Sequence, residues 1–76
     1  MKLPLVSGKK LIKILSARGF EVARQRSSHI QMKDKKGRLV TIPIHSGKDV
    51  SIGILLKILR DAEISREEFI ELEKSA

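Results

Sequence analysis

His29 and His45 are the clearest candidates for chemistry in this sequence, because imidazole exchanges protons near neutral pH. His29 opens the alternating segment His29-Ile30-Gln31-Met32-Lys33 and follows two serines in a basic stretch. On RNA, a base that deprotonates the ribose 2′-hydroxyl lets that oxygen attack the adjacent phosphorus, and nearby cations stabilise the charge that develops. We therefore take His29 as the candidate catalytic residue. The alternative is an exposed strand histidine with no chemical role.

His45 is the second candidate, because it follows Pro43 at the start of the polar segment His45-Ser46-Gly47-Lys48-Asp49. It could serve as an auxiliary general acid, hydrogen-bond the backbone of this loop, or only fix the turn. Two histidines without carboxylates at a ligand-like spacing do not make a metal site. The chain also has no Cys and no glycine-rich phosphate loop. We therefore expect neither a metal nor a cofactor.

Cations near His29 are the candidates for holding an RNA backbone. One group surrounds a hairpin turn predicted at residues 34–37, and a second lies on one face of the first predicted helix. Together they indicate a groove around His29, although a charge run also keeps a turn soluble and a serine before a strand is often only a turn residue. The RNA-binding candidates are Lys9, Lys10, Lys13, Arg26, Ser28, Lys33, Lys35, Lys36 and Arg38.

The charge of the chain points to a polyanionic partner. Its 76 residues include 16 Lys and Arg against 9 Asp and Glu, for a formal net charge of +7. Residues 1–38 carry eleven of the basic residues and only two acidic ones, whereas the rest of the chain is slightly acidic. The aromatic residues are Phe20 and Phe69 alone, which argues against recognition by stacking bases on exposed rings. We expect RNA to be held mainly through its backbone.

Hydrophobic periodicity predicts three helices and three strands. Helical spacing predicts helices at residues 8–18 and 52–62, capped by Ser7 and Ser51, and a third after the capping box Ser65-Arg66-Glu67-Glu68. Alternation predicts strands at 20–26, 29–33 and 38–44. The order αβββαα indicates an α+β fold in which a three-stranded antiparallel sheet packs against helices. The apolar positions that carry these patterns are Leu11, Ile12, Ile14, Leu15, Phe20, Val22, Ile30, Met32, Val40, Ile42, Ile44, Ile52, Leu55, Leu56, Leu59, Phe69, Ile70 and Leu72.

Length and composition predict one small domain over residues 1–76. With 41% hydrophobic and 33% charged residues, the chain is ordinary for a globular domain. No apolar run reaches the ~18 residues that a membrane-spanning helix needs. We therefore expect a cytoplasmic protein that does not contact membranes and is monomeric when free.

The chain resembles the HicA toxins of bacterial and archaeal toxin–antitoxin pairs, also called the YcfA-like family. The landmarks are Arg18-Gly19-Phe20, Ser27-Ser28-His29, the segment Val40-Thr41-Ile42-Pro43-Ile44-His45-Ser46-Gly47, and Ser65-Arg66-Glu67-Glu68-Phe69. Two positions depart from the family pattern. Ser27 stands where the family commonly has Gly, and Glu63 stands where a Gly usually precedes the cap of the last helix.

The resemblance implies a fold like that of double-stranded-RNA-binding domains, metal-independent cleavage of mRNA, and inhibition by a HicB-like antitoxin that covers the active site. The family's catalytic histidine falls on His29. Two alternatives stay open. The chain could be a non-catalytic module that binds duplex RNA by its shape and phosphates, or a protein whose main activity is assembly with its antitoxin.

Overall fold

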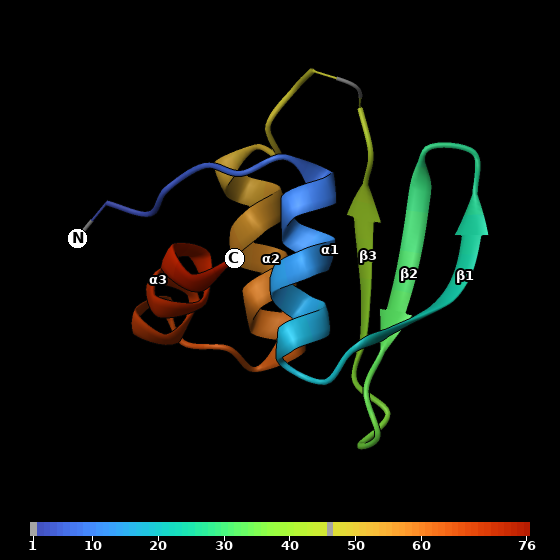
Figure 1. The fold of residues 1–76 in the computed structure, drawn as a ribbon. Helices are drawn as coiled ribbons and strands as arrows, with labels where there is room; N and C mark the ends of the chain where they lie inside the picture. The colour runs from blue at the N-terminus through green and yellow to red at the C-terminus, as the bar shows by residue number, and fades with distance from the viewer. Residues whose placement is uncertain (1, 46) are drawn as a thin grey trace.

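The computed structural model describes residues 2–45 and 47–76 and contains six elements in the predicted order (Figure 1). The α+β prediction is confirmed, and the bounds predicted for the first two helices and the three strands lie within one residue of the observed ones. Ser46, part of the expected polar loop, lies outside the described residues. The elements are α1 (Gly8–Ala17), β1 (Glu21–Arg26), β2 (His29–Lys33), β3 (Leu39–Pro43), α2 (Ile52–Ala62) and α3 (Arg66–Ser75).

Each helix begins at the predicted serine cap. The Oγ atoms of Ser7, Ser51 and Ser65 accept hydrogen bonds from backbone N–H groups three residues further on, at 3.1, 3.4 and 3.1 Å. Each bond satisfies one of the donors that a helix start leaves without a partner. One detail of the prediction is wrong: the Glu68 carboxylate does not reach back to the cap but pairs with Arg18 of the neighbouring helix.

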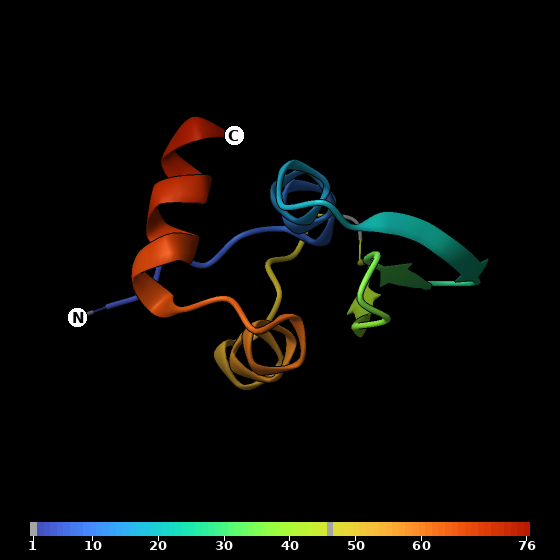
Figure 2. The same ribbon diagram turned by 90° about the horizontal axis from the view of Figure 1, so that it is seen from below.

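The three strands form one antiparallel sheet in the order β1-β2-β3. Helices α1 and α2 pack beside β3, so β1 is the sheet edge farthest from the helices (Figures 1 and 2). The β1–β2 turn and the β2–β3 turn lie at opposite ends of the sheet (Figure 1). This arrangement leaves the sheet face opposite the helices open to a ligand.

The buried apolar residues form one cluster to which all three helices, β2 and β3 contribute. Met32, Val40 and Ile42 are at most 1% exposed, and they confirm the predicted alternation of β2 and β3. Two predicted core positions are wrong: Val22 is 53% exposed because β1 is an uncovered edge, and Ile52 is 48% exposed because α2 buries Ile58 instead. Ile12, Ile30, Ile44, Leu56, Ile70 and Leu72 are only partly buried at the margin of the cluster.

None of the helices in the described parts of the chain is long and apolar enough to cross a membrane.

Candidate active site

His29 lies on the sheet face that points away from the core. It is exposed, whereas Met32 on the other face of β2 is fully buried. Because successive strand residues point to opposite faces, His29, Gln31 and Lys33 share the outer face, as the sequence predicted. Residues paired across an antiparallel sheet point the same way, so the strand register shows which side chains surround His29.

A β-bulge in β1 brings two arginines to this face. The register runs from Val22 opposite Met32 to Arg24 opposite Gln31, so that Ala23 is an extra residue. Without the bulge, alternation from Val22 would have placed the side chains of Arg24 and Arg26 on the same face of the sheet as Met32, toward the helices. Because of the bulge, both arginines instead point to the outer face, and bulges near functional sites commonly redirect side chains in this way.

The outer face is organised as rows that cross all three strands. Arg26 pairs with His29, which pairs with Pro43. In the next row, two residues along β2, Arg24 pairs with Gln31, which pairs with Thr41. Of these residues, the sequence predicted only Arg26 as a neighbour of His29, since Arg24, Gln31 and Thr41 are brought beside it by the pairing register alone.

These two rows enclose a shallow hollow of about 240 Å³. It is lined by Arg24, Arg26, His29, Gln31 and Thr41, and no acidic residue contributes to it. The hollow thus combines a group that can exchange a proton with two guanidinium groups, which hold phosphate oxygens well. Such an arrangement is suited to a phosphodiester rather than to an apolar ligand.

Ser28 and His45 lie at the end of the sheet where β1 turns into β2. The Ile44 N–H donates to the Ser28 carbonyl at 2.6 Å, which extends the β2–β3 pairing up to the residue before His45. The His45 carbonyl accepts from the Lys48 N–H at 3.1 Å, and its side chain is exposed. His45 therefore lies near the row of His29 but does not line the hollow.

The hairpin cations lie at the opposite end of β2. Lys33 is four residues from His29, or roughly 13 Å along the strand, and Lys35 and Lys36 are exposed at the turn beyond it. Arg38 is engaged within the protein, at 3.2 Å from Asp34 and 3.0 Å from Glu63. The cluster is therefore separate from the hollow and could contact only a more distant part of a bound strand.

Asp34 holds this turn together. Its Oδ1 accepts from the backbone N–H groups of Lys36 at 3.0 Å and Arg38 at 2.8 Å. Burial by itself raises the pKa of Asp34, but these two N–H groups and the Arg38 guanidinium together hold the pKa of the carboxyl below its usual value. The turn thus presents its lysines on a fixed backbone.

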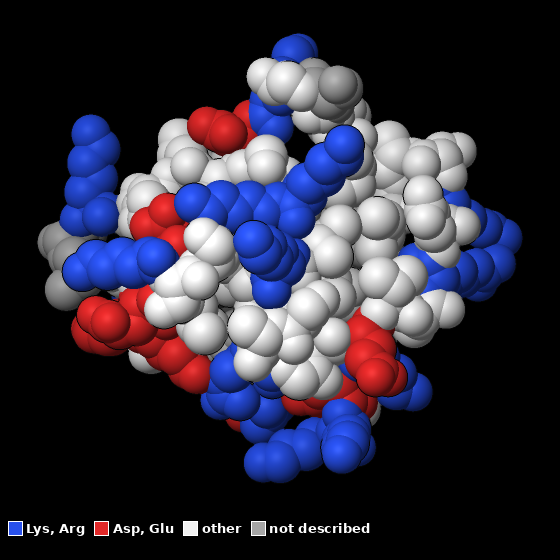
Figure 3. Space-filling model, in the orientation of Figure 1, with Lys and Arg blue, Asp and Glu red and all other residues white. Residues whose placement is uncertain are grey.

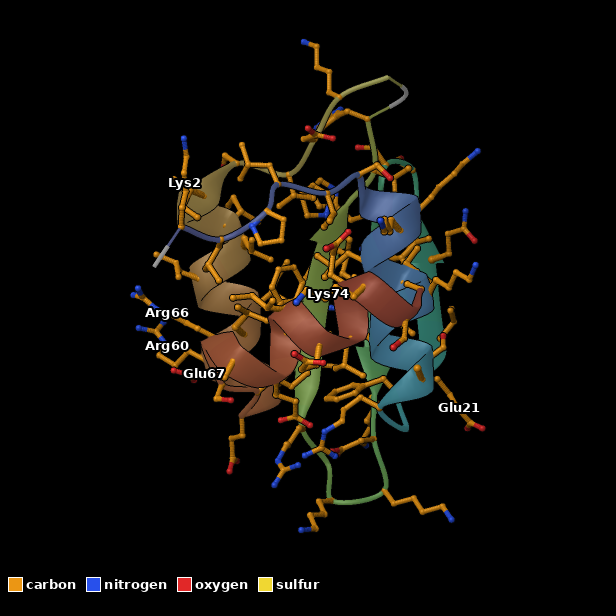
Figure 4. All side chains as sticks on the ribbon, turned by 60° about the vertical axis from the view of Figure 1, so that its left-hand side comes forward. Lys2, Glu21, Arg60, Arg66, Glu67 and Lys74 are labelled. Carbon is orange, nitrogen blue, oxygen red and sulfur yellow. The ribbon has the colours of Figure 1, made fainter. Side chains whose placement is uncertain are left out.

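Helix α3 neutralises part of the basic face of α1. Lys10 Nζ lies 2.8 Å from Glu73 Oε2, and Arg18 pairs with Glu68. These contacts form because α3 packs across α1 (Figure 4). Lys9 and Lys13 remain exposed. Figure 3 shows that Lys and Arg lie in several separate groups on the visible face rather than in one continuous patch.

Within residues 2–45 and 47–76, no three His, Asp or Glu side chains gather as they would around a metal ion.

Comparison with known protein families identifies the family to which the chain is similar. The sequence model of a family described as the HicA toxin of bacterial toxin–antitoxin matches residues 8–64 of the 76. The match includes α1, all three strands and α2, and therefore every residue that lines the hollow. Among curated proteins, none matches the chain.

Proposed function

The chain belongs to the HicA toxin family of bacterial toxin–antitoxin systems, and from this premise we propose that it is an endoribonuclease that cleaves mRNA with His29 as its catalytic residue. The observation that carries the proposal is the hollow in which His29 lies with Arg24 and Arg26. Membership of the family suggests the kind of reaction, and the hollow contains His29, the proposed base, beside the two arginines.

The proposed reaction needs only groups of the chain and of the RNA. His29 accepts the proton of a ribose 2′-hydroxyl, and the 2′-oxygen forms a bond to the adjacent phosphorus. Arg24 and Arg26 stabilise the negative charge on the phosphoryl oxygens. The bond from phosphorus to the 5′-oxygen of the next nucleotide then breaks, and this oxygen takes a proton from the imidazolium, from His45 or from water. The products are a 2′,3′-cyclic phosphate and a 5′-hydroxyl, formed without a metal or cofactor.

The other cations are proposed to bind the RNA backbone outside the hollow. Lys33, Lys35 and Lys36 are exposed beyond one end of it, and Lys9 and Lys13 are exposed on α1. Lys10 and Arg38 would first have to exchange a carboxylate partner for a phosphate. Ser28, which directly precedes His29, is also proposed to contact the RNA backbone.

The proposed biological setting follows from the family. A HicB-like antitoxin would bind the toxin and cover the hollow, so that mRNA is cleaved only when the antitoxin is lost. The site of action is the cytoplasm, where mRNA is translated, and the free toxin is proposed to act as a monomer of one domain.

Cleavage of RNA by the purified protein tests the function. In the presence of a chelator, the parent protein should cleave, and His29→Ala should be slower by at least about 100-fold, the usual loss when a general base is removed. Arg60→Ala serves as the control because Arg60 is exposed on α2 and does not line the hollow. Equal rates for His29→Ala and the parent would remove His29 from the mechanism. Tight binding of duplex RNA by the parent with no cleavage would favour the non-catalytic module instead.

A further inference from the structure

Gln31 and Thr41 are the uncharged polar residues that line the hollow beside His29. They pair directly across β2 and β3, so their Cβ atoms lie about 5 Å apart on the same face. Arg24 pairs with Gln31 from the other side. The three side chains therefore form a row of two hydrogen-bonding groups and one guanidinium.

This row lies immediately beside the proposed cleavage row. Gln31 is two residues from His29 on the same strand, or roughly 6.6 Å. A nucleotide whose phosphate lies between His29 and Arg26 therefore has its base, or that of its neighbour, within reach of Gln31 and Thr41. None of the lysines proposed to bind the RNA backbone lines the hollow.

The two side chains are free to bind a ligand. Among the hydrogen bonds between described residues, neither the Gln31 amide nor the Thr41 hydroxyl takes part in one. The amide offers two donors and an acceptor, and the hydroxyl both donates and accepts. Phe20 and Phe69 are at most 2% exposed, so neither phenyl ring is available to a base on this face. Because His29 is assigned to proton transfer, the flat face of an arginine guanidinium is the group we consider for stacking a base.

We propose that Gln31 and Thr41 form a subsite that hydrogen-bonds the nucleobase next to the cleaved phosphodiester, with the flat face of the Arg24 guanidinium stacked against that base while its N–H edge donates to the phosphoryl oxygen. The subsite rests on the proposed function, and it makes the protein a nuclease with a base preference at one position beside the cut. An enzyme that held RNA only through its backbone would show no such preference.

To test this subsite, the protein is incubated with an RNA library of randomised bases, and the ends produced by cleavage are sequenced. For the parent, one position at a fixed distance from the cut should show a base enriched about tenfold, the discrimination expected of a good side-chain pair with a base. Gln31→Ala and Thr41→Val should flatten this preference while cleavage continues. Gln31→Glu, which replaces the amide donors by an acceptor, should shift the preference toward cytosine, whose amino group donates to carboxylates.

Gln25→Ala is the matched control, because Gln25 pairs with Ile30 and so points to the other face of the sheet. It should retain the parent's preference. Thermal unfolding of each variant shows that it is folded, and the isosteric Thr41→Val provides a second test of the subsite if Gln31→Ala is unstable. If both variants keep the parent's preference, the subsite is wrong although the nuclease stands. If the parent cuts without any base preference, the subsite is wrong as well. If the parent does not cut RNA at all, the proposed function itself fails.

Discussion

Ser27 and Glu63 stand where the resemblance leads us to expect glycine, and both have a left-handed backbone. Their φ angles are 47° and 57°, and no other non-glycine residue in the described parts of the chain has a positive φ. A side chain at such a position costs free energy because Cβ crowds the following carbonyl. The backbone conformation alone therefore explains why glycine suits both places, without any requirement for close approach of RNA.

Ser27→Gly should stabilise the protein slightly. Removing Cβ relieves a strain of about 1–2 kcal/mol, while the more flexible glycine stabilises the unfolded chain by roughly 0.4–1 kcal/mol. We expect the free energy of unfolding in urea to rise by about 0.8 kcal/mol, the difference between the midpoints of these two ranges. Ser28→Gly is the control, because Ser28 has no positive φ and should lose stability. A loss in both variants would contradict the strain at Ser27.

Glu63 differs from Ser27 in having a second role. It caps the C-terminus of α2, and its carboxylate lies 3.0 Å from Arg38 Nε. This ion pair connects the β2–β3 hairpin to α2. Because the Glu63 side chain is 66% exposed, this ion pair contributes little, about 0–1 kcal/mol. Its effect is rather to hold Arg38 away from solvent, which reduces the number of hairpin cations available to RNA.

At the scale of elements, the site depends on how closely α1 approaches β3. A Cβ at Gly8 would lie 2.6 Å from both the Pro43 carbonyl oxygen and Ile44 Cδ1. The Ile44 side chain could move, but the Pro43 carbonyl is part of the backbone of β3. Pro43 is also the β3 residue that pairs with His29. Glycine at position 8 thus allows the first turn of α1 to pack directly on the sheet.

Gly8→Ala should destabilise the fold by about 1–3 kcal/mol, the usual cost of an added group in a packed site. Gly53→Ala is a matched control because Gly53 occupies the first turn of α2, and a Cβ there meets nothing within 4 Å. There, alanine should gain up to about 0.5–1 kcal/mol from its better helix propensity. Urea unfolding of the two variants should give changes of opposite sign, and a stabilised Gly8→Ala protein would contradict the close packing.

The same elements show what the sequence could predict about this site. Local signals were sufficient for the three serine caps and for the alternation of β2, which places His29 outside and Met32 inside. The bulge at Ala23 could not be predicted, since it exists only in the pairing of β1 with β2. The position of Arg24 beside Gln31, and so the hollow itself, depends on that non-local register.

At the scale of the whole molecule, the distribution of charge differs from that expected from chain order. The basic first half does not form one RNA-binding surface, because carboxylates of α3 and α2's C-terminus pair with Lys10, Arg18 and Arg38. These pairs join residues 25 to 63 positions apart in the sequence. Among the cations proposed to bind RNA, those without a carboxylate partner among the described residues are the two arginines of the hollow, the hairpin lysines Lys33, Lys35 and Lys36, and Lys9 and Lys13 on α1.

The salt dependence of RNA binding separates local contacts from net charge. Each phosphate contact with a single strand contributes about 0.7 to the slope of log K against log salt concentration. In a His29→Ala background, in which cleavage is slowed, Lys35→Ala with Lys36→Ala should therefore reduce this slope by about 1.4. The control is Lys57→Ala with Lys74→Ala, which lowers the net charge equally but removes cations that lie near Asp61 and Glu71 on α2 and α3. If the hairpin lysines contact RNA, only the variant that lacks Lys35 and Lys36 changes the slope. Equal reductions of the slope in the two double variants would show that net charge alone attracts the RNA and that the hairpin turn makes no contact of its own.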